Sequence, residues 1–214
     1  MNTKPLFGAA ALLLTLGACS NDTPAPSSTP EPDPVDVVNQ VADDYYAFVM
    51  ETMPEAAYFS GVELERHDGL SNNSLAASAA RDAAIDAMLT ELKTVDGDAL
   101  IGDPAWITHA YLLEELEGNV GVRVCRTELW NVNQMGGWHS GYAQIAQLQP
   151  VGTPELREQS LARWSKFEAY IDREMENLEE GLGLSYSAPK TVVQRVIDQV
   201  DGVLALEVEQ SPFY

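Results

Sequence analysis

The sequence predicts an all-α fold, a multihelical array of about five or six helices with one irregular loop region at about residues 127–151. Apolar residues recur at spacings of three and four along most of the 214-residue chain, which is the period of a helix. No alternating run of apolar and polar residues between turn residues indicates a pair of strands.

Three helices are expected in the first half of the chain. The first spans Val35 to Met53, with valines and aromatic residues at helical spacing. The second spans Ser74 to Val95 and is rich in alanine, with one stripe of larger apolar residues. Asp103-Pro104 combines a capping side chain with a first-turn proline, and predicts a third helix that runs to about Gly118.

Two further helices are expected in the second half. Thr153-Pro154 repeats the cap-and-proline device and predicts a long fourth helix. Gly181 and Gly183 favour its termination, because glycine is the preferred residue just past a helix end. Ser187-Ala188-Pro189 then opens the last helix, which carries a nearly continuous row of valines.

The N-terminal residues have the pattern of a bacterial lipoprotein signal peptide, assigned to residues 1–18. One positive charge at Lys4 precedes an apolar run from Leu6 to Leu16 that is too short to span a membrane as a mature helix. Leu16-Gly17-Ala18-Cys19 matches a lipobox, in which the Cys19 thiol is acylated and becomes the mature N-terminus. An ordinary secretory signal with an incidental cysteine is the alternative.

The next residues, 19–34, are rich in Pro, Ser and Thr and predict a disordered tether to a helical domain at 35–214. Ser20, in place of an aspartate, favours the outer membrane, facing the periplasm. The formal charge of −21 becomes −22 once Lys4 is removed, since no acid precedes Cys19. A surface this acidic repels nucleic acid and anionic lipid headgroups, so no nucleic-acid partner is expected and the membrane contact is expected through the lipid anchor.

The irregular region contains the candidate ligand-binding residues. Rigid aromatic rings, side-chain amides and a flexible backbone turn are typical of loops that contact small ligands. The alternative is a buried connection whose amides satisfy its own backbone. The candidate residues are Trp130, Asn131, Asn133, Gln134, Gly136, Gly137 and Trp138.

Neither a metal site nor a catalytic constellation can be assembled from this sequence. The three histidines, His67, His109 and His139, have no second histidine four residues on, as a helical zinc pair requires. With Cys19 acylated, Cys125 is alone, either as a buried inert thiol or with a partner in sequence not present here. No catalytic residue, metal ligand or cofactor is therefore assigned to this chain.

Seven short segments of the second half carry a recognisable pattern: Trp130–Met135, Gln149–Gly152, Ala162–Trp164, Tyr170–Asp172, Asn177–Gly181, Ala188–Lys190 and Val196–Gln199. Their order and spacing resemble the N-terminal part of the DUF885 family, bacterial proteins that are often secreted or lipid-anchored. The resemblance covers roughly residues 37 to 214.

This family is similar to zinc metallopeptidases with a thermolysin-like motif, and its members are longer than this chain. Their His-Glu-rich segment lies in the C-terminal part and has no counterpart here. The resemblance therefore implies the N-terminal helical portion of a hydrolase acting on peptides or another small substrate. It places zinc only in a missing C-terminal half, which would be this portion's intramolecular partner. A non-catalytic helical binding or scaffold lipoprotein is the alternative.

Acylation of Cys19 can be tested by substitution. Because the thioether-linked lipid would be the anchor, Cys19→Ala is expected to release the chain from membranes or to block its processing. Incorporation of labelled palmitate into the wild type reports the modification directly. Equal membrane retention of the variant, with no label in the wild type, would contradict the lipobox assignment.

Overall fold

The structure, a computed structural model, describes residues 32–214. The predicted signal peptide (1–18), the acylation site Cys19 and nearly all of the 19–34 tether lie outside the described residues. Helices and turns make up the described part, which contains no strand, so the all-α class is confirmed.

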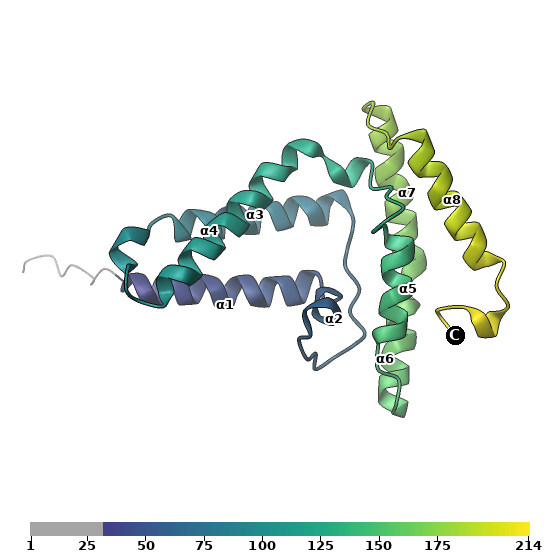
Figure 1. Cartoon of the computed structure of the whole chain (residues 1–214), viewed down its shortest axis with the longest axis horizontal. Helices are drawn as coiled ribbons and strands as arrows, with labels where there is room; N and C mark the ends of the chain where they lie inside the picture. The colour runs from purple at the N-terminus through teal and green to yellow at the C-terminus, as the bar shows by residue number, and fades with distance from the viewer. Residues whose placement is uncertain (1–31) are drawn as a thin grey trace, which may run out of the picture. The chain divides into compact units, whose positions relative to one another are not determined.

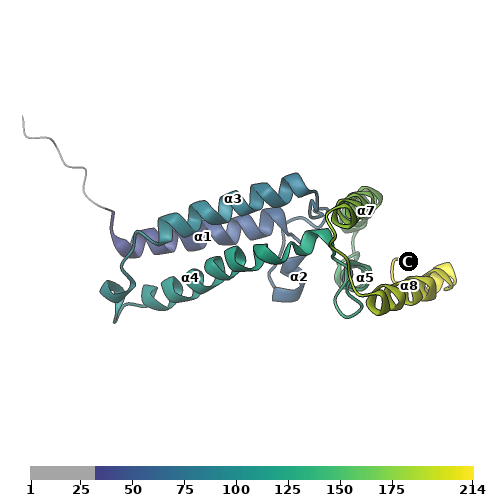
Figure 2. The same ribbon diagram turned by 90° about the horizontal axis from the view of Figure 1, so that it is seen from above.

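Three long helices form the first packing unit. α1 (Pro34–Thr52), α3 (Leu75–Leu92) and α4 (Ala105–Val122) run side by side in both ribbon views, and the 3-10 turn η1 (Gly97–Leu100) closes the corner between α3 and α4 (Figures 1 and 2). Val38, Leu92 and Leu116, one from each helix, have no exposed surface. Burying a side chain of this size contributes about 1.5–3 kcal/mol, so this apolar seam holds the three helices together.

The second packing unit is aromatic. α5 (Trp138–Leu148), α6 (Pro154–Trp164) and α7 (Phe167–Gly183) meet around the Tyr142 ring. Its centroid lies 5.1 Å from that of Phe167 and 4.9 Å from that of Tyr170, both in edge-on geometry. Such pairs contribute about 0.5–1.5 kcal/mol beyond their buried area, and they fix the relative rotation of α5 and α7.

The remaining elements are short or lightly packed. α2 (Ala56–Ser60) follows α1, the 3-10 turns η2 (Arg123–Cys125) and η3 (Thr127–Leu129) follow α4, and η4 (Val208–Gln210) lies near the C-terminus. α8 (Lys190–Leu204) has no buried residue. None of the described helices is both long enough and apolar enough to cross a bilayer.

The predicted helix starts are confirmed by their capping bonds. The Thr153 hydroxyl accepts from the Leu156 amide at 3.2 Å, with Pro154 in the first turn of α6. The Asp103 carboxylate accepts from the Ala105 amide at 2.8 Å, and Pro104 directly precedes α4. These bonds satisfy amides that have no partner within the helix.

Two predicted boundaries are wrong in detail. The region 127–151 is not irregular throughout, because α5 occupies its second half, with Gly137 as the N-cap. The long helix expected from Pro154 is two helices, α6 and α7, that break at Ser165. The Ser165 hydroxyl donates to the Ala162 carbonyl at 3.0 Å, a local bond that competes with the helical ladder.

The two packing units are joined by residues 61–74, which connect α2 to α3. Asn73, near the end of this segment, bonds it to α7. Its side-chain amide donates to the Tyr170 carbonyl at 3.0 Å and to Glu174 at 2.9 Å. The Asn177 amide in turn donates to the Asn73 carbonyl at 2.7 Å. The N-terminal side of α3 is therefore bonded to the buried face of α7.

Close approach of η3 to α7 depends on Gly181. A Cβ atom at this position would overlap the Leu129 carbonyl, so Gly181→Ala is expected to lower the free energy of unfolding by about 1–3 kcal/mol. Gly183→Ala is the matched control, because a Cβ there meets no atom within 4 Å. Urea unfolding measures both, and equal stability of the two variants would contradict the close packing of η3.

Candidate functional site

Trp130 lines a groove at the end of α7. The groove has a volume of about 350 Å³, and its walls come from η3 and the residues after it, the last turns of α7, the 186–190 connection and the start of α8. Apolar side chains dominate the lining, which comprises Leu129, Trp130, Val132, Leu178, Leu182, Tyr186, Ser187, Ala188, Lys190 and Val193.

One wall of this groove is fixed by polar bonds and by the η3–α7 contact. The Trp130 indole N–H donates to the Cys125 carbonyl at 2.9 Å, which sets the ring's orientation. Next to it, the Asn131 amide donates to Glu174 at 2.9 Å. Glu174 is only 3% exposed and receives a second amide from Asn73, so the loop is tied to the interior of the protein.

The opposite wall, α8, is held much less firmly. Its polar contacts with the loop pass through Gln199, whose side chain pairs with His139 Nε2 at 3.0 Å and donates to the Gln134 carbonyl at 3.1 Å. Exposed side chains with few buried contacts mark the elements that open most readily. One wall of the groove is therefore held by buried polar bonds, and the other by exposed ones.

A second hollow of about 180 Å³ lies further along α8. Trp138, His139 and Phe167 line it from α5 and α7, and Val200, Val203 and Leu204 line it from α8. The two tryptophans predicted to contact ligand therefore line separate hollows beneath the same helix.

The other predicted site residues have local roles. Asn133 accepts from the Met135 amide at 2.8 Å, and Gln134 bonds α8 through its carbonyl. Gly136 is exposed, whereas Gly137 is buried, and a Cβ there would overlap the Asn133 carbonyl. Of the three amide residues, only Asn133 bonds the backbone of its own loop, whereas Asn131 bonds α7 and the Gln134 carbonyl bonds α8. Of the seven predicted residues, Trp130 lines the larger of these two hollows.

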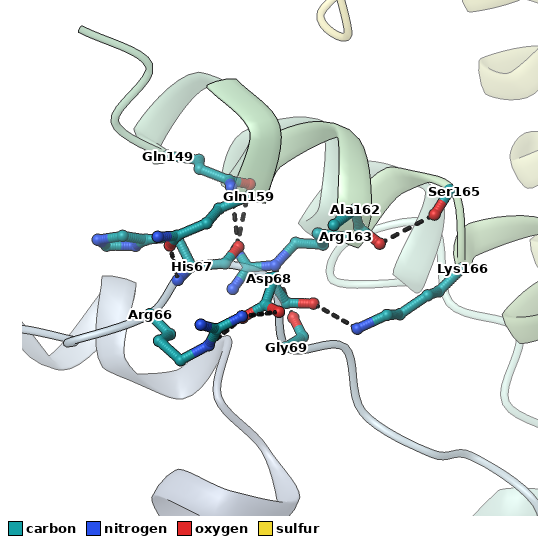
Figure 3. A network of polar contacts seen from close by, with 10 residues as sticks. All are labelled: Arg66, His67, Asp68, Gly69, Gln149, Gln159, Ala162, Arg163, Ser165 and Lys166. Atoms are coloured by element: carbon teal, nitrogen blue, oxygen red, sulfur yellow. Dashed lines mark hydrogen bonds and ion pairs between the residues drawn. The ribbon is translucent and has the colours of Figure 1, made fainter. Parts of the chain in front are cut away.

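A polar network around Arg163 was missed by the sequence analysis. Arg163 has no exposed surface, and its guanidinium donates to the Gly69 carbonyl at 2.6 Å, the Tyr58 hydroxyl at 2.9 Å and Gln149 at 3.3 Å. Figure 3 shows the side chain reaching from α6 to the 66–69 segment. The sequence offers no clear signal for this burial, because α6 is mostly polar and Arg163 is one of its two arginines.

His67 belongs to the same network, and the Arg163 charge affects its protonation. Its Nδ1 lies 2.6 Å from the Tyr58 oxygen, which already accepts from Arg163, so the tyrosine proton points to a neutral imidazole. Burial, followed by the nearby Arg163 charge, lowers the pKa of His67 from its ordinary value of 6.5. Burial also raises the pKa of Tyr58, which keeps that hydroxyl protonated.

The three histidines do not fit a zinc site. His67 faces Tyr58 and Arg163, His109 is buried against Gly97, and His139 pairs with Gln199. Within residues 32–214, no group of three or more His, Cys, Asp or Glu side chains is placed to hold a metal ion. The Cys125 thiol is exposed, so the buried-thiol alternative is wrong.

Within the described residues the fold is all-helical, with a mostly apolar groove at the end of α7. The chain belongs to the DUF885 family, described as bacterial proteins of unknown function, which it matches over residues 54–214. No curated protein matches the sequence, and no solved structure does.

His67 makes the docking of the 66–69 segment dependent on pH. Its pKa is lower in the folded than in the unfolded chain, so the unfolded chain binds the proton first as pH falls below about 6.5. The free energy of unfolding is expected to fall from pH 6.5 through the folded pKa, and His67→Gln is expected to reduce this slope. Urea titrations of both proteins between pH 7.5 and 5 measure the difference. If the free energy of unfolding changes with pH equally in both proteins, His67 is not the group responsible.

Proposed function

We propose that this chain is the membrane-tethered, N-terminal helical portion of a DUF885-type metal-dependent hydrolase, with peptides as the substrate class. Acylated Cys19 would hold it at the outer membrane, facing the periplasm. In this proposal the helices bind and orient substrate, while the zinc ligands and the general base belong to sequence outside residues 1–214.

The observation that carries the proposal is the groove beside Trp130. Its lining runs from Leu129 to Val193, entirely within the residues that match the family. Concave, mostly apolar surfaces with a few polar groups are the usual form of small-ligand sites. Trp130, which the sequence predicts to contact ligand, is part of this lining.

The chain's own contribution to catalysis would be positional. The η3 loop, fixed to α7 through Asn131 and Glu174, presents the Trp130 ring as a rigid wall. The lightly held α8 can adjust to the substrate. Holding a substrate in one orientation lowers the entropic part of the barrier, whichever groups perform the chemistry.

A non-catalytic binding lipoprotein is the second candidate, and the groove supports it equally well at the level of binding. The two proposals differ in the gene sequence they expect beyond the codon for Tyr214. A frame that continues into a His-Glu-rich segment supports the hydrolase, whereas a stop codon at that point favours the binding protein.

The purified chain is expected to retain no stoichiometric zinc after dialysis and to cleave no peptide, because the His67, His109 and His139 side chains lie in separate surroundings. Elemental analysis and a mixed-peptide assay measure both, with a known zinc peptidase as the positive control. One zinc per chain together with peptide cleavage would overturn the assignment of the chemistry to sequence outside this chain.

A further inference from the structure

The groove beside Trp130 combines an apolar lining with a single charge. Lys190 is the only charged residue among the lining side chains, and no carboxylate lines the groove, although the chain as a whole carries a net charge of −21. Lys190 is exposed and forms no ion pair within residues 32–214. A lone cation at the edge of an apolar groove on an acidic protein complements an anion that carries an apolar group.

The start of α8 adds to the positive potential at the same edge. Lys190 is the first residue of this 15-residue helix, and the preceding Pro189 provides no side-chain cap for the first amides. The N-terminal end of a helix carries a partial positive charge that favours anions. The ammonium group of Lys190 and the uncapped amides therefore act in the same direction on a ligand in the groove.

The size of the groove limits the apolar part of the ligand. Its volume of about 350 Å³ is near the lower end of the range of about 300–1,000 Å³ for small-molecule sites. Trp130 and Tyr186 supply aromatic surface, and Leu178, Leu182 and Val193 supply aliphatic surface. This volume accommodates one large apolar or aromatic side chain.

We propose that the groove binds the C-terminal residue of a short peptide, with an apolar side chain against Trp130 and Leu182 and the free carboxylate at Lys190 and the first amides of α8. The assignment of a peptide rests on the proposed function, whereas the preference for an apolar carboxylate rests on the groove alone. Capture of a chain-terminal carboxylate by backbone amides is an established mode of peptide recognition. The groove would then select the free end of a peptide over an internal segment.

The test compares three probes on the purified full chain: acetyl-Ala-Phe with a free carboxylate, the same dipeptide with a C-terminal amide, and decanoate. Binding is followed by NMR through the indole N–H signal of Trp130, assigned with the Trp130→Phe variant. The free acid is expected to bind about fivefold more tightly than the amide, the effect of a partly exposed ion pair assisted by a helix N-terminus. Decanoate is expected to bind more weakly than the free acid.

Two variants and a control identify the groups responsible. Lys190→Met is expected to reduce the preference for the free acid to about twofold, because only the helix N-terminus then remains. Val193→Phe, which fills the groove, is expected to weaken both dipeptides. Lys93→Met is the matched control, because Lys93 lies on the three-helix unit and pairs with Glu117 at 2.7 Å. Far-ultraviolet circular dichroism confirms that each variant is folded.

Equal affinity for acid and amide, an unchanged preference in Lys190→Met, or undiminished binding in Val193→Phe would each overturn the proposal. Tighter binding of decanoate than of the free-acid dipeptide would indicate a fatty acid as the ligand and would likewise overturn the proposal. These outcomes are independent of zinc content and peptide cleavage. If the chain binds the free acid selectively but the hydrolase proposal is contradicted, the preference of the groove for an apolar carboxylate still holds.

Discussion

Three charged side chains are buried where the two packing units meet, and none of them forms an ion pair within residues 32–214. Glu55 receives the Ser71 amide at 2.7 Å, Glu174 receives the side-chain amides of Asn73 and Asn131, and Arg163 donates to a backbone carbonyl and two side chains. Burying a charge costs several kcal/mol unless hydrogen bonds replace its water. Correct placement of residues 66–74 is therefore required for all three charges, which ties the position of this segment to the fold of α6 and α7.

This constraint explains why the groove has unequal walls. Glu174 is stabilised partly by Asn131, so the loop that carries Trp130 cannot leave α7 without depriving a buried carboxylate of one donor. Gly181 allows η3 to lie directly on α7 from the other side. No comparable buried charge holds α8, whose attachment to the loop depends on the amide of Gln199. The loop wall is bonded to the buried Glu174, whereas α8 contacts no buried charge through a hydrogen bond within the described residues.

The helical class, the helix starts at Thr153 and Pro104 and the end of α7 near Gly183 could be predicted because each depends on local chemistry: spacing, a capping oxygen, or a glycine. The helix at Trp138–Leu148 was not predicted, and its buried residues Tyr142 and Ile145 pack on residues of α6 and α7 that are distant in sequence. The break at Ser165 was not predicted either, because a serine within a helical pattern does not by itself indicate that its hydroxyl bonds the backbone. Trp130 lines the groove, and its contact with a ligand stays a prediction. The bonds that the sequence did not predict join distant residues: Glu174 is 43 residues from Asn131, and Gly69 is 94 residues from Arg163. Contacts between residues so far apart in sequence produce no periodic pattern along the chain.

The exposed thiol of Cys125 gives direct experimental access to the groove. Its backbone carbonyl holds the Trp130 indole N–H at 2.9 Å, so a probe attached to the sulfur would sit a few bonds from the aromatic wall. With Cys19 occupied by lipid as proposed, Cys125 would be the single reactive thiol of the mature chain, and one labelling reaction would place one reporter. A fluorophore quenched by tryptophan at this position would report changes around the Trp130 ring in real time, in a membrane-bound sample and without any substitution in the protein.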